Sequence, residues 1–232
     1  MIVIDNINKS YNGRTVLNIP DLSINKKEIL GLVGNNGAGK TTLLRLMLDL
    51  IKPEKGGIKL NDVLNSKNEH WKSFTGSYLD ESFLIDYLTP AEYFEFVGGL
   101  YSISTKQINM YLKPYEDFLG DEILSAENKY IRDFSSGNRQ KIGIVAAMFI
   151  SPLILILDEP FAHLDPTSQF RLSNLISRLN SYNGTTVIIS SHNLEHISSV
   201  CSRIALLEEG EIINDFKNEQ IDIDKLKTYF FS

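Results

Sequence analysis

The sequence predicts an α/β fold with a mixed, mainly parallel central sheet, an antiparallel β region at the N-terminus and a helical subdomain. Two observations carry this prediction. Aliphatic runs at residues 27–33, 153–157 and 185–190 have the nearly continuous apolar character of parallel strands that are covered on both faces. Between residues 89 and 150 the spacing becomes typical of helices, with many aromatic side chains. We therefore expect a single domain, with its core at 1–88 and 151–232 and a helical subdomain at 89–150.

The elements follow from the N-terminus onward. Isoleucines at residues 2–7 and the segment 11–17 predict two strands joined by a turn at Asn12-Gly13. The strand at 27–33 leads through glycines into a helix at 42–48. Aromatic spacing predicts a helix at 93–101, and the most apolar region predicts a buried helix followed by a buried strand at 142–157. Residues 203–213 predict a second hairpin.

Composition excludes several classes of protein. The net charge of -6 argues against a nucleic-acid binder that relies on general basicity. The apolar region at 142–157 is too short to span a membrane. The single cysteine, Cys201, and an N-terminus without a secretion signal favour a reducing compartment. We therefore expect a cytoplasmic protein with no nucleic acid as partner.

A glycine-rich loop joins the strand at 27–33 to the helix at 42–48. Its spacing, a glycine, four residues, then Gly-Lys-Thr, predicts a phosphate-binding loop. Its backbone N–H groups can surround a phosphate chain, Lys40 supplies a positive charge, and the Thr41 hydroxyl can bind Mg²⁺. We expect ATP to contact Gly34, Asn35, Asn36, Gly37, Ala38, Gly39, Lys40, Thr41 and Thr42. The alternative is a glycine turn that joins strand to helix without a ligand.

Two carboxylates end the strand at 153–157. Asp158 and Glu159 stand at its carboxyl end, where open α/β sheets bind ligands. We expect Asp158 to hold Mg²⁺, and Glu159 to orient and polarise the water that attacks the γ-phosphate. An Asp-Glu pair alone is often only a solvated strand end. Combined with the phosphate loop, it predicts ATP hydrolysis.

These two motifs and their surroundings resemble the nucleotide-binding domain of the ATP-binding cassette (ABC) family, in the family's order over nearly the whole chain. The resemblance implies a P-loop NTPase core. It also implies that Tyr11 stacks on the adenine of ATP and that Val16 adds an apolar contact. Without the resemblance, Tyr11 would be interpreted as a packing residue.

A segment at residues 134–138 resembles the family's signature, which is usually Leu-Ser-Gly-Gly-Gln. Here it is Phe134-Ser135-Ser136-Gly137-Asn138, so three of the five positions differ. The resemblance implies that Ser135, Ser136 and Gly137 contact the γ-phosphate of ATP bound to a second subunit. The alternative is that Ser135 is a simple helix cap.

Other positions take their roles from the resemblance alone. Leu164-Asp165-Pro166 is similar to the family's dimer-contact loop, while the neighbouring His163 is assigned no chemistry. His192 resembles the γ-phosphate sensor and joins Lys40 and Glu159 as a catalytic residue. Glu81 stands where the family usually has a glutamine. It is implied as a metal ligand beside Thr41 and Asp158.

The resemblance further implies a head-to-tail dimer, with an identical or related chain, that closes on two ATP molecules and opens after hydrolysis. Transmembrane permease subunits would bind a groove near Phe83, Leu84, Tyr87 and the helix at 93–101. The chain would then lie on the inner face of the cell membrane. The alternative is that these aromatic residues build the core of the subdomain. The short tail resembles subunits of bacterial exporters more than importers.

Two other functions remain open from the sequence. The altered signature and Glu81 suggest an ATP-binding switch with little turnover. A soluble ABC ATPase that serves ribosomes, DNA repair or cluster assembly is the third candidate. The chain has one cassette and no coiled-coil insertion, which favours transport over this last function.

Overall fold

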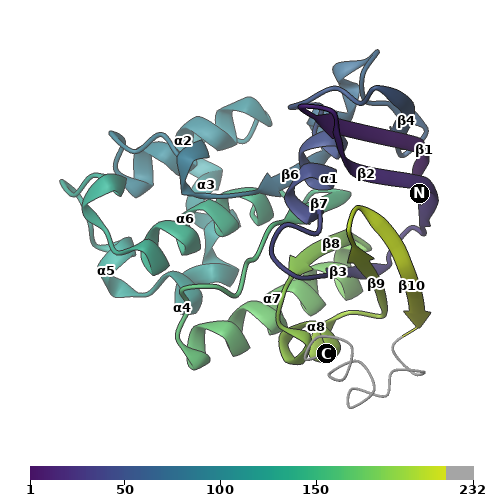
Figure 1. Ribbon diagram of the computed structural model, residues 1–232. Helices are drawn as coiled ribbons and strands as arrows, with labels where there is room; N and C mark the ends of the chain where they lie inside the picture. Colours follow the sequence, from purple (N-terminus) through teal and green to yellow (C-terminus); the bar gives the residue numbers. More distant parts are fainter. Residues whose placement is uncertain (218–232) are drawn as a thin grey trace.

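A six-stranded sheet forms the centre of the protein (Figure 1). The computed structural model describes residues 1–217, so the last part of the expected core, 218–232, lies outside the described residues. The strand order is β10-β9-β3-β8-β7-β6, and among these described strands β10 alone is antiparallel to its neighbour. The strands are β3 (Ile29–Val33), β6 (Thr75–Tyr78), β7 (Ile154–Leu157), β8 (Thr186–Ser191), β9 (Arg203–Glu208) and β10 (Glu211–Lys217).

The central strands are buried because two separate hydrophobic cores cover their faces. Leu30 and Leu32 of β3 join a core shared with α1 (Lys40–Met47) and the N-terminal strands. Ile29 and Val33 of β3 join a second core. This core includes α6 (Ser136–Met148), α7 (Pro166–Asn183) and α8 (Leu194–Val200). Every residue of β3, β7 and β8 is buried, which explains their continuous aliphatic character.

A second sheet of four strands, β2-β1-β4-β5, contains the N-terminal hairpin. Its strands are antiparallel: β1 (Ile2–Tyr11), β2 (Arg14–Ile24), β4 (Lys55–Leu60) and β5 (Val63–Leu64). The predicted turn is present, with positive φ at Asn12 and Gly13, as a two-residue hairpin loop requires. The sequence did not predict β4, because Lys55-Gly56-Gly57 lacks the residues that favour strands.

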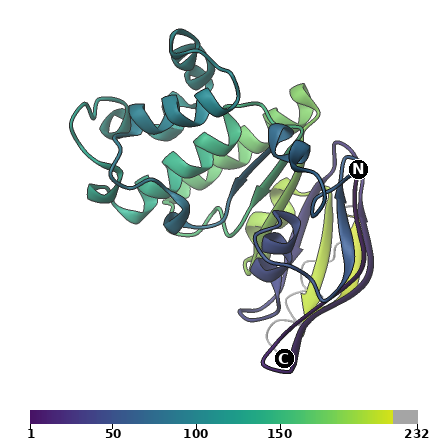
Figure 2. The ribbon, with the colours of Figure 1, turned by 90° about the horizontal axis from the view of Figure 1, so that it is seen from above.

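The helices between residues 90 and 148 lie on the opposite side of the molecule from the antiparallel sheet (Figure 2). Besides α6 they are α2 (Pro90–Leu100), α3 (Thr105–Leu112), α4 (Glu116–Leu119) and α5 (Asp121–Leu124). A capping box of Thr89 and Glu92 begins α2. Tyr93 and Phe94 are buried in the core, whereas Phe96 is 48% exposed. The predicted aromatic face is therefore divided between core and surface.

The parallel strands end at one edge, which brings distant segments together. The phosphate loop follows β3, Asp158 follows β7 and His192 follows β8. In the register of the sheet, Val33 lies beside Ser191 and Leu157 beside Ile189. This edge is where an open α/β sheet binds its ligand. No helix in the described residues is long and apolar enough to cross a membrane.

Candidate functional site

The phosphate loop follows a backbone path that requires glycine at two points. Gly39, the N-cap of α1, has a φ of 111°, and a Cβ there would lie 2.8 Å from Cδ2 of Leu17. Gly34 packs against β9 so closely that a Cβ would lie 2.2 Å from the carbonyl oxygen of Leu207. The N-cap glycine offers no side-chain acceptor to the first turn of α1. The N–H groups of that turn are therefore suited to an anion.

Lys40 is the buried cation of this loop, with 6% of its surface exposed. Its Nζ donates to the carbonyl oxygens of Gly34 at 2.6 Å and Asn35 at 3.3 Å. The same atom lies 3.5 Å from Oε1 of Glu159. The ammonium group is therefore fixed between the loop and the end of β7, where a bound phosphate would meet it.

Asp158 is buried and held by two hydroxyl groups. Thr41 Oγ1 donates to its Oδ2 at 2.6 Å, and Ser190 Oγ donates to its Oδ1. Burial raises the pKa of the Asp158 carboxyl group, although the hydrogen bonds from Ser190 and Thr41 act in the opposite direction. A hydroxyl and a carboxylate are hard oxygen ligands of the kind that Mg²⁺ prefers, so the pair fits this ion. In residues 1–217 no cluster of three His, Cys, Asp or Glu side chains could hold a metal. Mg²⁺ usually keeps several waters and binds one or two carboxylates together with substrate phosphates, which agrees with this small set of protein ligands.

Glu159 links the phosphate loop to His192. Its Oε1 faces Lys40, and its Oε2 lies 2.9 Å from His192 Nδ1. The Glu159 backbone has a φ of 45°, and its N–H donates to Ser190 Oγ at 2.9 Å. Gln140 of α6 donates to the carbonyl oxygen of Pro160 at 2.7 Å and so supports the turn that follows. The structure brings together all three side chains that were predicted to be catalytic.

Two cavities meet at Glu159. The first, about 320 Å³, is lined by Tyr11, Val16, Asn35, Asn36, Gly37, Gly39, Lys40, Thr41, Thr42 and Glu159. The second, about 440 Å³, contains Asp158, Glu159, Glu81 and His163 among its lining residues. Tyr11 is 46% exposed, and Lys9 Nζ lies 5.1 Å from the centre of its ring. This tyrosine is therefore accessible at the mouth of the first cavity.

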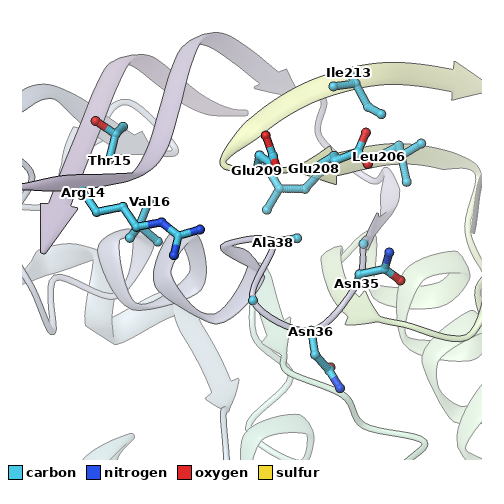
Figure 3. A pocket seen from close by; sticks show the side chains of 13 residues that line it. Arg14, Thr15, Val16, Asn35, Asn36, Ala38, Leu206, Glu208, Glu209 and Ile213 are labelled. Carbon is cyan, nitrogen blue, oxygen red and sulfur yellow. The ribbon is translucent and has the colours of Figure 1, made fainter.

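A larger cavity, about 630 Å³, also borders the phosphate loop (Figure 3). Arg14 and Val16 of β2 border it on one side, and Glu208 and Glu209 at the end of β9 border it on the other. Lys40 does not line this cavity. Two carboxylates disfavour a phosphate there, so the smaller cavity at Lys40 is the better phosphate site despite its size.

The signature-like segment begins α6. Ser135 is the N-cap, and its Oγ accepts a hydrogen bond from the N–H of Asn138 at 3.3 Å. This bond agrees with the simple capping role. Ser135, Ser136 and Gly137 line neither of the two cavities at Glu159. A Cβ at Gly137 would lie 2.7 Å from the carbonyl oxygen of His163, so the start of α6 packs closely against the loop before α7.

The unusual signature residues have partners within the subdomain. Phe134 is buried, with Lys129 Nζ 4.1 Å from the centre of its ring. Asn138 Nδ2 donates to Glu122 Oε2 at 2.9 Å, and Lys129 pairs with Glu122 Oε1 at 2.9 Å. These residues therefore tie the start of α6 to α5 and to the loop that follows it.

Glu81, the third predicted metal ligand, forms an ion pair with α6. Its Oε2 lies 2.5 Å from Arg139 Nη2. Glu81 nevertheless lines the same cavity as Asp158. The Glu81 carboxylate thus lies beside the expected metal site, and it is paired with Arg139.

Three residues with a place in this site were not predicted from the sequence. Ser190 holds both Asp158 and the Glu159 backbone, Gln140 supports the turn after β7, and Arg139 binds Glu81. The signal for Ser190 was a polar residue at the end of an apolar strand, two positions before His192. Arg139 and Gln140 follow the signature directly, but their partners are distant in sequence.

The sequence profile of the ABC transporter family matches residues 17–162, which is more than half of the chain. The chain belongs to the ABC transporter family. It is 35% identical over 193 residues to an uncharacterized ABC transporter ATP-binding protein of Nostoc sp., covering 83% of this chain and 57% of that protein. It is 33% identical over 228 residues to the bacitracin transport ATP-binding protein BcrA of Enterococcus faecalis, covering 97% of this chain and 70% of BcrA. The ABC chain thus spans little more than half the length of the Nostoc relative.

Solved structures of ABC proteins share the fold of this chain. One is a dimeric, post-hydrolysis ATP-binding cassette bound to ADP and Pi. It has a TM-score of 0.83 and 23% identity, and the match covers 95% of this chain and 100% of that one. The predicted P-loop NTPase fold is therefore confirmed. At the level of the family, the chain is an ATP-binding subunit, which supports the prediction of ATP as its ligand. ATP hydrolysis and Mg²⁺ belong to the function proposed below.

Proposed function

We propose that this ABC subunit hydrolyses ATP as one half of a dimer and drives a separate permease in the membrane. One observation carries the dimer: Ser135, Ser136 and Gly137 line neither cavity at Glu159. A nucleotide at Lys40 would therefore meet a signature segment only if another subunit supplied it. The similar cassette that was solved as a dimer supports this arrangement.

On this proposal, each residue of the site has a defined task. The N–H groups of residues 34–42 and the Lys40 ammonium group bind the phosphates, while Tyr11 and Val16 bind the base. Thr41 and Asp158 hold Mg²⁺, which when bound neutralises charge on the β- and γ-phosphates. Glu81 lines the same cavity as Asp158 and forms an ion pair with Arg139.

Glu159 is the proposed base that orients the attacking water. Both of its carboxylate oxygens already have partners, Lys40 on one side and His192 on the other. When Lys40 turns to a phosphate, Oε1 of Glu159 becomes free to accept a hydrogen bond from water. His192 keeps Oε2 in place and presents its ring to the γ-phosphate. Nucleotide binding would thus break the contact between Lys40 and Glu159 and leave the Glu159 carboxylate available to the attacking water.

Permease binding is proposed for the apolar surface near the end of β6. Phe83 and Tyr87 are 51% and 64% exposed, whereas Leu84 is buried. A cavity of about 250 Å³ includes Phe83, Trp71 and Tyr101 in its lining. This grouping supports a docking groove, and binding there would hold the subunit at the inner face of the membrane. The similarity to a bacitracin transport protein supports transport, and export stays the prediction made from the sequence.

Purification of the tagged chain from detergent-solubilised membranes tests this function. We expect a membrane-spanning protein to co-purify in a stable ratio, and we expect Phe83→Ser to release it. Phe170→Ser is the matched control, because Phe170 is an exposed phenylalanine of α7 that does not line the proposed groove. Co-purification with ribosomes or a soluble assembly complex, and with no membrane protein, would contradict the proposal.

A further inference from the structure

Glu81 and Arg139 lie far apart in the sequence, and the fold brings their charges together. Glu81 begins a short 3-10 helix (Glu81–Phe83) just after β6, which is the strand at one edge of the central sheet. Arg139 is the fourth residue of α6, which begins at Ser136. Glu81 Oε2 lies 2.5 Å from Arg139 Nη2. The ion pair therefore connects the edge of the sheet with the first turn of the helix that the signature-like segment begins.

The surroundings of Arg139 direct its charge towards Glu81. The other terminal nitrogen, Nη1, makes only a long contact of 3.4 Å with the carbonyl oxygen of Arg132. Nε is buried and has no hydrogen-bond partner among the described residues. About a third of each side chain is exposed, 31% for Glu81 and 30% for Arg139. The pair is thus only partly screened by water, and its charges matter to the cavity beside it.

That cavity, about 440 Å³, contains four carboxylate side chains: Asp80, Glu81, Asp158 and Glu159. Lys40 lies 3.5 Å from Glu159, and Asp158 receives hydrogen bonds from Thr41 and Ser190. Glu81 has Arg139 as its counter-ion. Carboxylates that share a site repel one another, and they also repel the phosphates of a nucleotide. Without Arg139, the charge of Glu81 would add to those of the other carboxylates beside the phosphate site.

We propose that Arg139 is a positioning residue that neutralises Glu81 and holds it against α6, away from Asp158. The paired glutamate then adds no net charge to the phosphate site. The inference rests on ATP binding at Lys40. Loss of Arg139 frees Glu81 to join Asp158 and Glu159, which weakens the binding of ATP when no Mg²⁺ is present. With Mg²⁺ the loss is smaller, because the freed carboxylate faces the cation as well as the phosphates.

Equilibrium binding of a fluorescent ATP analogue to the full chain tests the pair, in EDTA and in Mg²⁺. The variants are Arg139→Gln, Glu81→Gln, the double variant, and Arg139→Lys, which keeps the positive charge. Arg132→Gln removes an equal charge from the same subdomain without contacting Glu81, so it is the matched control. Lys40→Ala tests the nucleotide site itself, so failure of that site is distinguished from failure of the pair.

In EDTA we expect Arg139→Gln to weaken binding roughly three- to tenfold, the effect of one unit charge at a partly exposed site. The double variant, Arg139→Lys and Arg132→Gln should bind within about twofold of the wild type. Glu81→Gln leaves the charge of Arg139 unpaired, so this variant should bind ATP at least as tightly as the wild type. An unchanged affinity in Arg139→Gln would overturn the proposal. So would weak binding that the double variant fails to restore. If Arg139→Gln does not fold, the double variant decides: recovery of folding and of ATP binding supports neutralisation of Glu81 by Arg139, and a double variant that also fails to fold overturns the proposal.

Discussion

The end of the parallel strands and the start of α6 are built in different ways. At the strand ends, Lys40 and Asp158 are buried, and Glu159 makes contacts on both sides of its carboxylate. At the start of α6, the contacts of Ser135 and Asn138 are exposed. The first region forms a closed network within one chain. The second lies at the surface, where Ser135 is exposed and residues 136–138 are partly exposed at a helix N-terminus.

This difference indicates how the tasks of the site are divided. A closed, buried network fixes the groups that bind the phosphates and the metal before any nucleotide arrives. A surface segment can instead be presented to another subunit, and it contributes only when the two subunits meet. Substitutions at the strand ends should therefore abolish binding or chemistry outright. Substitutions at the start of α6 should weaken the contact between subunits and leave the nucleotide bound.

The largest effect is expected from Lys40→Ala. Loss of the cation that the loop fixes should abolish detectable ATP binding and reduce hydrolysis by roughly 100-fold or more. Isothermal titration and phosphate release measure the two effects. Lys52→Ala is the control, because Lys52 is exposed and, among the residues that the structure describes, forms its ion pair with nearby Asp49 at 2.6 Å. Equal ATP affinity and turnover in Lys40→Ala and the wild type would refute the assignment of the loop.

Glu159→Gln separates binding from chemistry within the buried network. The amide keeps the shape of the side chain but cannot act as a base, so we expect hydrolysis to fall by about 100-fold or more while ATP still binds. ATP should then produce a stable dimer, seen as a doubled mass by light scattering. Equal, negligible hydrolysis by the wild type and the variant would instead favour the low-turnover switch, provided that the permease partner is present in the assay.

The sequence predicted the strand ends well because their chemistry is local. A glycine loop after one strand and two carboxylates after another are each contiguous, and the topology of a parallel sheet brings them to the same edge. Lys40, Asp158 and Glu159 were therefore all expected where the structure has them. Ser190 was not expected, because a serine at a strand end has many possible partners.

The start of α6 was harder to predict. The order of residues 134–138 indicated a signature-like helix start, but not that Asn138 would bind Glu122 or that Arg139 would bind Glu81. Such pairs depend on how loops pack in three dimensions, and no periodicity in the sequence reports it. The weak strand β4 was missed for a different reason, since the pairing with β1 overrides the poor strand propensity of its glycines.

Ser135→Ala tests the start of α6 against a second helix N-cap that lies outside the signature-like segment. Ser135 and Ser104 are both helix N-caps, and loss of either hydroxyl should cost about 1 kcal/mol of stability. Only Ser135 belongs to the segment proposed to meet the nucleotide of a second subunit. We therefore expect Ser135→Ala to reduce hydrolysis and ATP-dependent dimerisation roughly tenfold, the value of one charge-assisted hydrogen bond, and Ser104→Ala to change neither. Equal activity of the two variants would mean that Ser135 acts only as a helix cap.

The smallest expected effect is a gain in stability from Asp158→Asn. Because burial raises the pKa of Asp158, its ionised form is disfavoured in the folded protein. The folded state then holds this proton more tightly than the unfolded state, so wild-type stability falls as the pH rises from about 4 through the raised pKa.

The stability of Asp158→Asn does not fall with pH in this way, because an amide does not titrate. Above this pH window we expect the free energy of unfolding of the variant to exceed that of the wild type by about 1 kcal/mol, a common size for stabilising substitutions at functional sites. Thermal unfolding between about pH 4 and pH 8 measures the difference, which should grow through the window and then stay constant. Asp165→Asn is the control with the opposite sign, because hydrogen bonds from Ser168 lower the pKa of Asp165. Its Tm should not rise at any pH. The contrary outcome is a lower Tm for Asp158→Asn at the alkaline end of this range. It would mean that the hydrogen bonds from Ser190 and Thr41 outweigh the cost of burying the charge. The strand end would then be arranged for stability rather than for a metal.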